Sequence, residues 1–167
     1  MKKENFWASD KQRNGALPSY QYFYRKARNP PPLFKIFYKI LLRISSLVYC
    51  VELSSHTKIG KGLYIGHPSG ITINPQTVLG DNINIHKGVT IGQENRGKRK
   101  GVPIIGNCVW IGINSTIVGN IRIGDDVLIA PNTFVNCDVP SHSVVFGNPC
   151  VIKHRDNATE KYINNKV

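Results

Sequence analysis

Apolar residues recur every six positions from about residue 57 to the end of the repeat region of this chain. One series is apolar at every member: Ile105, Ile111, Ile117, Ile123, Ile129 and Val135. A second series follows four residues later in each repeat: Val109, Ser115, Ile121, Val127 and Thr133. A period of six fits neither an amphipathic helix nor a long alternating strand. It predicts short strands joined by tight turns and stacked as an all-β solenoid.

The N-terminal segment follows a different pattern. Residues 1–30 are polar and aromatic without a clear period, and a run of prolines at 30–32 then breaks the chain. Residues 33–50 have apolar positions at helical spacing, with Lys35, Lys39 and Arg43 four apart on one face. We predict a helical, basic extension over 1–50, a solenoid domain over 51–155 and a C-terminal tail over 156–167.

The charge balance narrows the range of partners. The 167 residues include 22 Lys and Arg against 10 Asp and Glu, a net charge of +12. Such a chain suits nucleic acid, anionic lipid or a phosphorylated ligand. Because no nucleic-acid motif accompanies the charge, we expect no nucleic-acid partner. With 41% hydrophobic residues, the chain has enough apolar material for a packed core.

Several features bear on the compartment. No apolar stretch is long enough for a spanning helix, and the N-terminus lacks the apolar run of a signal peptide. The four cysteines form no CxxC pair and read as buried thiols in a reducing compartment. We therefore expect a cytoplasmic protein. The basic helix over 33–48 suits either an anionic membrane surface or packing against the solenoid or a neighbouring subunit.

Hexads of the form Ile-Gly-x-x-Val-x, as at Ile105-Gly106 and Ile111-Gly112, resemble those of the left-handed parallel β-helix acyltransferases. The resemblance covers roughly residues 51–155. It implies three hexads, or about 18 residues, per triangular coil. It also implies a left-handed helix, a homotrimer and active sites between adjacent subunits. The segment 139–150 resembles the Gly-x-Pro-Ala element that ends the coil in this family, with Cys150 in place of Ala.

One segment breaks the hexads and carries a candidate base. The run from Leu63 to Gly70 includes His67 and resembles the His segment of serine O-acetyltransferases, which places the catalytic base at His67. Acyl transfer to a hydroxyl needs such a base, because a free hydroxyl is a poor nucleophile near neutral pH. For an isolated histidine, a structural role at a coil corner would be the better interpretation. Inside this motif, the catalytic one is favoured.

Two further residues are candidates for the same site. The family has an Asp fifteen residues before its His, and Glu52 stands there; it either orients His67 or is a solvated charge. His86 follows His67 by nineteen residues, about one coil, which puts it one rung along near the same edge. It either contacts substrate or is an outward polar side chain.

An interruption at residues 93–101 predicts an extruded loop. In the family this loop lines the acceptor and acetyl-CoA sites, so Arg96 is a candidate for the acceptor, and Lys98 and Arg99 for the phosphates of coenzyme A. For any single cation, a solvated side chain is the simpler interpretation. Further coenzyme A candidates match the family by position: Gly92, Gly112, Ala130, Pro131 and Asn132.

The chain departs from serine acetyltransferases where the amino acid would be held. Gly66 stands beside the acceptor in place of the usual Asp, and Gly101-Val102 replaces an Arg-His pair. A site without those charges should bind serine poorly. We therefore expect an acetyl-CoA-dependent O-acetyltransferase with a sugar hydroxyl of a surface or capsular glycan precursor as first acceptor and L-serine as the alternative.

Two other classes remain open. A zinc enzyme of the β-helix carbonic anhydrase type needs three convergent histidines; His67 and His86 supply two, and the closely spaced pair is absent, so no metal is expected. A non-catalytic trimeric scaffold is the other possibility. His142 and His154 show no ligand spacing and are assigned structural roles.

Overall fold

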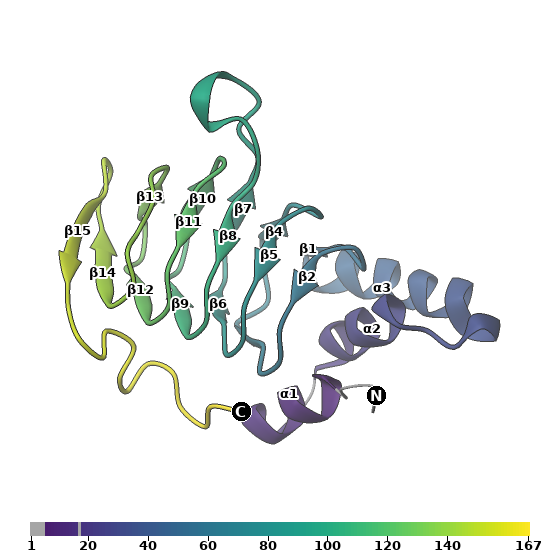
Figure 1. Cartoon of the computed structure of the whole chain (residues 1–167). Helices are drawn as coiled ribbons and strands as arrows, with labels where there is room; N and C mark the ends of the chain where they lie inside the picture. Colours follow the sequence, from purple (N-terminus) through teal and green to yellow (C-terminus); the bar gives the residue numbers. More distant parts are fainter. Residues whose placement is uncertain (1–5, 17) are drawn as a thin grey trace.

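The computed structural model describes residues 6–16 and 18–167, so the start of the predicted extension, residues 1–5, lies outside it. The chain forms a parallel β-solenoid with helices at its N-terminal end (Figure 1). The helical part comprises α1 (Phe6–Asn14), α2 (Ser19–Arg28), the 3-10 turn η1 (Pro32–Phe34) and α3 (Lys35–Tyr49). The 33–50 helix is thus found at 35–49, whereas α1 and α2 were not located within 1–30.

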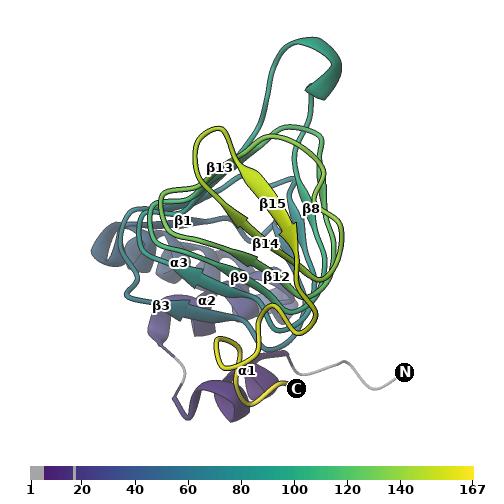
Figure 2. The ribbon, with the colours of Figure 1, turned by 90° about the vertical axis from the view of Figure 1, so that its left-hand side faces the viewer.

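Three sheets form the sides of the solenoid, which has a triangular cross-section (Figure 2). Sheet A contains β1 (Val51–Leu53), β4 (Ile71–Ile73), β7 (Thr90–Gly92), β10 (Thr116–Val118) and β13 (Phe134–Val135). Sheet B contains β2 (Lys58–Ile59), β5 (Val78–Leu79), β8 (Ile104–Ile105) and β11 (Arg122–Ile123). Sheet C contains β3 (Tyr64–Gly66), β6 (Asn84–His86), β9 (Val109–Ile111), β12 (Val127–Ile129), β14 (Ser143–Phe146) and β15 (Val151–His154). All pairings are parallel except β14 with β15.

The hexad residues fill the interior, as predicted. Every member of the series from Ile105 to Val135 is at most 2% exposed. The second series is equally buried, including its polar members Ser115 and Thr133, whose hydroxyls both donate to Ala130 O. The period of six is therefore the period at which side chains return to the interior.

Pairing register shows where the coils depart from regularity. Thr72 pairs with Thr90, and Thr116 with Phe134, each 18 residues on. Glu52, however, pairs with Thr72, 20 residues on, and Thr90 pairs with Thr116, 26 residues on. The first coil therefore has two extra residues and the third has eight.

The helices cover the open end of the first coil. Asp10 of α1 accepts from Arg25 Nε of α2 at 2.7 Å and from the backbone N–H of Leu63 at 2.9 Å. The Tyr24 hydroxyl donates to Thr57 O at 2.8 Å. Gln21 Nε2 likewise donates to Leu63 O, at 2.8 Å. Because an unpaired strand edge invites association, these contacts give the coil a defined end.

The C-terminal tail returns along the solenoid toward α1 (Figure 1). Asp126 accepts from the backbone N–H groups of Ala158 and Thr159, each at 3.0 Å, and from the Thr159 hydroxyl at 2.7 Å. At its end, Val167 and Asn82 exchange two hydrogen bonds of 2.9 and 3.0 Å. The tail is thus fastened at two places.

The cysteines are less buried than expected. Cys50 is exposed, because it ends α3 in the left-handed conformation with its side chain turned to solvent. The other three are half-buried, and the sulfur atoms of Cys137 and Cys150 lie 3.7 Å apart. All four are free thiols.

Candidate active site

His67 lies on the extra length of the first coil. From Gly66 to Thr72 the chain takes six residues, whereas their partners His86 and Thr90 are only four apart. The two extra residues therefore lie at the corner between sheets C and A, where His67 follows β3. His67 has a positive φ of 55° and an exposed side chain. The corner thus holds an imidazole outside the regular wall of the solenoid.

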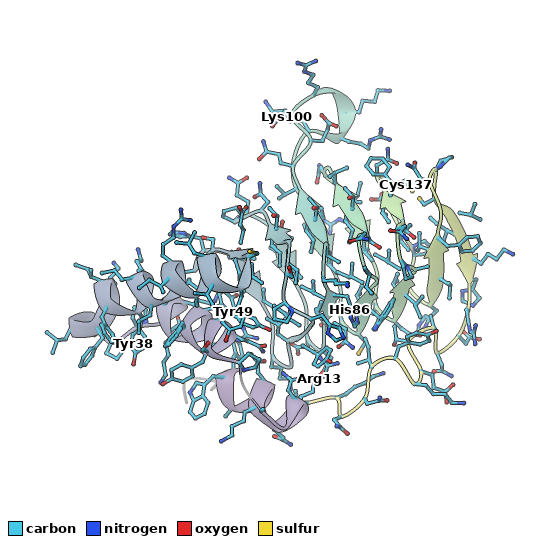
Figure 3. All side chains as sticks on the ribbon, turned by 180° about the vertical axis from the view of Figure 1, so that it is seen from behind. Arg13, Tyr38, Tyr49, His86, Lys100 and Cys137 are labelled. Atoms are coloured by element: carbon cyan, nitrogen blue, oxygen red, sulfur yellow. The ribbon has the colours of Figure 1, made fainter. Side chains whose placement is uncertain are left out.

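His86 occupies the neighbouring rung at the same corner. It pairs with Gly66, so the predicted one-rung separation from His67 agrees with the register. Its ring packs against Trp110, with centroids 4.7 Å apart, and Tyr64 lies edge-on to it at 6.3 Å. Figure 3 labels His86 on this outer face, not far from Arg13.

The surroundings of His86 favour its neutral form. Burial lowers the pKa of His86, and a positive charge on nearby His67 lowers it further. No group in the described part of the chain hydrogen-bonds to its buried Nε2. A neutral imidazole with a free ring nitrogen therefore lies next to the exposed His67.

Gly66 is required by this packing. A Cβ at Gly66 would lie 2.9 Å from His86 Nδ1 and 3.1 Å from a ring carbon of Tyr64. The His86 ring thus takes the space in which a larger side chain at position 66 would begin. The loss of an acidic residue before His67 and the gain of His86 are two sides of one arrangement.

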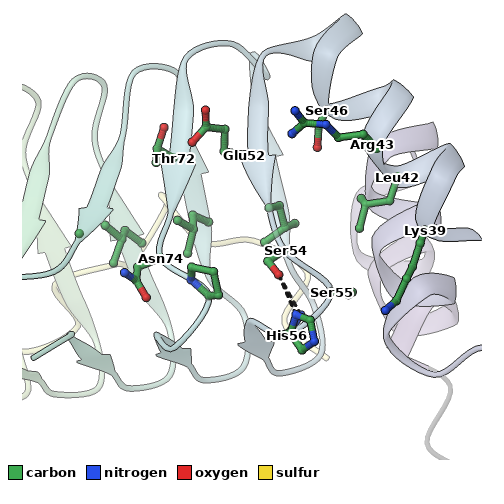
Figure 4. Close-up of a pocket in the computed structure, with 15 residues that line it drawn as sticks. Lys39, Leu42, Arg43, Ser46, Glu52, Ser54, Ser55, His56, Thr72 and Asn74 are labelled. Carbon is green, nitrogen blue, oxygen red and sulfur yellow. Dashed lines mark hydrogen bonds between the residues drawn. The ribbon is translucent and has the colours of Figure 1, made fainter.

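Glu52 lies on sheet A rather than at the His67 corner. It is exposed on β1 and lines a pocket of about 660 Å³ between α3 and sheet A, together with Lys39, Arg43 and Thr72 (Figure 4). His67 does not line this pocket. Within the described residues no hydrogen bond joins Glu52 to His67, so its orienting role stays a prediction.

The predicted coenzyme A residues fall into two groups. Gly112 follows His86 on the next rung of the same corner, and Ala130 comes next, since Gly112 N–H donates to Ile129 O. A Cβ at Gly112 would lie 2.5 Å from Pro131 N, so coil stacking alone explains this glycine. Asn132, at φ 57°, completes this group. Gly92 lies apart, on β7 at the other end of sheet A.

The extruded loop lies at a different corner from His67. All eight extra residues of the third coil lie between β7 and β8, at the A–B corner, and the loop is shaped by a bridge between Glu94 and Gly101 and by η2 (Gly97–Arg99). Arg96, Lys98 and Arg99 are exposed there. Within one subunit the loop and His67 are therefore not brought together.

The remaining histidines make local contacts. His142 Nδ1 lies 2.9 Å from Asp126 Oδ2, and His154 Nε2 lies 3.3 Å from Asp156. Across residues 6–16 and 18–167, no group of three His, Cys, Asp or Glu side chains is arranged to hold a metal ion. In that same part of the chain, no helix has the length and apolarity to cross a bilayer.

Several residues around His86 were not found from the sequence. Arg13, Tyr64, Trp110 and Tyr162 join it in lining a shallow pocket of about 320 Å³. Counting coils could have placed Trp110 on the rung after His86, because Asn84 pairs with Trp110. The contributions of α1 and of the tail have no such local signal.

Comparison with known proteins gives one matching family. Residues 103–137 match the bacterial transferase hexapeptide family (six repeats). Serine acetyltransferase from Helicobacter pylori is 36% identical over 110 residues, covering 66% of this chain and 64% of that protein. The Staphylococcus aureus enzyme is 36% identical over 118 residues, covering 71% of this chain and 55% of that protein.

Solved structures agree. Neisseria gonorrhoeae serine acetyltransferase in complex with serine matches with a TM-score of 0.66 and 33% identity, over 81% of this chain and 54% of that one. The Brucella abortus enzyme in complex with coenzyme A matches with a TM-score of 0.69 and 27% identity, over 82% and 54%. The chain thus spans between about half and two thirds of the length of these relatives. It is a hexapeptide-repeat protein with the left-handed parallel β-helix fold, similar in sequence and structure to the serine acetyltransferases.

Proposed function

We propose that the protein is an O-acetyltransferase that uses acetyl-CoA, with L-serine as the acceptor best supported by its relatives. The observation that carries the proposal is the exposed imidazole of His67 on the two extra residues of the first coil, next to the neutral His86. The relatives named above include one solved with serine and one with coenzyme A. This acceptor replaces our expectation of a sugar, which no relative named above supports.

In this reaction His67 takes the proton from the acceptor hydroxyl as its oxygen attacks the thioester carbonyl. The carbon–sulfur bond then breaks. The imidazolium returns the proton to the departing sulfur, which yields the acetyl ester and the free thiol of coenzyme A. His86, held neutral by burial, adds no second positive charge to oppose protonation of His67, and its free Nε2 can bond to the acceptor.

Coenzyme A fits the outer surface of the same corner. Small residues follow His86 along the solenoid axis at Gly112 and Ala130, about 4.8 Å per rung, and leave room for an extended pantetheine arm. The cations of the loop lie at another corner of the same subunit. A homotrimer in which the loop of one subunit reaches the His67 corner of the next would supply Arg96, Lys98 and Arg99 to the phosphates.

A sugar hydroxyl remains a second candidate acceptor on one specific observation. The His86 ring leaves no room for a carboxylate at position 66, so the usual partner for the serine ammonium group is missing beside His67. A neutral acceptor would not need that partner.

The test follows free thiol release from acetyl-CoA with L-serine and with a panel of nucleotide sugars. We expect L-serine to support turnover and His67→Ala to lower it by about 10²–10⁴-fold. His154→Ala, which removes another exposed imidazole, is the matched control and should keep wild-type turnover. Turnover only with sugars would overturn the serine assignment, and undiminished turnover in His67→Ala would overturn the assignment of the base.

A further inference from the structure

An apolar surface runs along one side of α3. Eight large apolar side chains of η1 and α3 are between 47% and 87% exposed: Leu33, Phe34, Ile36, Phe37, Ile40, Ile44, Leu47 and Val48. Within α3 their spacing of three and four residues puts them on one broad face of the helix. We call these eight residues the α3 face. Single exposed apolar residues are ordinary, but a contiguous patch marks an interaction surface.

The α3 face is held firmly in place by the opposite side of the helix. Leu42 and Ser45 are buried there, and Tyr49 packs on Tyr20 of α2 with ring centroids 4.9 Å apart. The α2 helix is in turn tied to the first coil through Tyr24 and Arg25. The exposed face is therefore not a surface that α3 could bury by turning over on its own support.

Positive charge borders the α3 face. Lys35, Lys39 and Arg43 follow one another at intervals of four and are all exposed, so they form a stripe along one edge of the apolar surface. The only carboxylate between residues 6 and 50 is Asp10, which is fully buried and paired with Arg25. The stripe therefore has no acidic neighbour within its own helices.

We propose that the α3 face docks on an anionic lipid bilayer, with α3 lying in the plane of the interface. An apolar face with a bordering row of Lys and Arg is the pattern of an interfacial helix, and the cytoplasmic leaflet of a membrane is anionic. A second copy fits less well, because it carries the same net charge of +12 and offers no complementary charge to the stripe. The inference does not depend on the proposed acetyl transfer.

The experiment is vesicle flotation with the full chain. Vesicles of phosphatidylcholine alone are compared with vesicles that also contain phosphatidylglycerol, and the molar mass in solution is measured in parallel. We expect flotation only with the anionic vesicles, lost in Ile40→Glu. Each neutralisation among Lys35→Gln, Lys39→Gln and Arg43→Gln should weaken binding about fivefold. Val151→Glu changes an exposed apolar residue of β15, and Lys58→Gln an exposed cation of β2; both should bind like wild type.

Three results would overturn the proposal. The first is the absence of flotation with anionic vesicles. The second is flotation that Ile40→Glu leaves unchanged, or that Lys58→Gln weakens as much as Lys39→Gln does, since binding would then come from net charge. The third is an oligomer that dissociates in Ile40→Glu without any lipid binding, which would make the α3 face an interface between copies of this chain.

Discussion

Gly66 and His86 occupy neighbouring rungs at the corner that carries His67, and a Cβ on Gly66 would lie 2.9 Å from Nδ1 of His86. We predict that Gly66→Ala lowers the free energy of unfolding by about 1–3 kcal/mol through overpacking. In a His86→Ala background the same change should cost much less, because the ring is gone. Urea unfolding of the four proteins gives the coupling energy. Equal costs in both backgrounds would show that the two residues do not compete for space.

Asp10 links both N-terminal helices to the first coil through Arg25 and the backbone of Leu63. Because Asp10 and Arg25 are both buried, removing one partner leaves an unpaired charge. We predict that Arg25→Met lowers the free energy of unfolding by about 3–5 kcal/mol. Thermal unfolding with Lys11→Ala, an exposed residue of the same helix, provides the control. A loss no larger than the control's would mean that the helices do not stabilise the coil.

Asp126 fastens the C-terminal tail in a pH-dependent way. Burial alone would raise the pKa of Asp126, but hydrogen bonds from Thr159, His142 and Ala158 lower it from 3.8 to about 2. A carboxyl whose folded pKa is depressed stabilises the fold above its unfolded pKa and loses that contribution as pH falls through the folded pKa. We therefore expect the tail to be held at neutral pH and released between about pH 4 and pH 2.

Hydrogen exchange of the amides of Ala158 and Thr159 measures this release directly. Asp126→Asn should weaken protection at neutral pH and flatten its dependence on pH. The fastening of Val167 by Asn82 is a second, uncharged contact and should not respond to pH in the same range. Unchanged protection in Asp126→Asn would contradict the assignment.

The loop cations give a prediction about coenzyme A. If Arg96, Lys98 and Arg99 pair with its phosphates, replacing all three by Ala should raise the KM for acetyl-CoA roughly tenfold or more, because each charge-assisted hydrogen bond contributes about 1.5–3 kcal/mol. The effect should shrink with added salt. Lys58→Ala on β2 is the control, and a KM that stays at the wild-type value in the triple variant would exclude this role.

The solenoid could be predicted from the sequence because its signal is local. Each hexad places an apolar side chain in the interior independently of distant residues, so the series from Ile105 to Val135 predicted the core correctly. The separation of His67 and His86 followed from the same counting, since one coil has nearly constant length. The helix over residues 33–50 was likewise visible in its own spacing.

The closure of the ends and the surroundings of the site depend on tertiary structure. Asp10 meets Leu63, 53 residues away, and Asp126 meets Thr159, 33 residues away, and no periodicity encodes such contacts. The same holds for the separation of Glu52 from the His67 corner and for the packing of His86 against Trp110. The sequence by itself therefore determined the repeat and the rung on which each candidate lies. Only the folded chain decided which side chains meet across its corners and ends, because those contacts depend on extra residues in a coil and on distant segments returning to it.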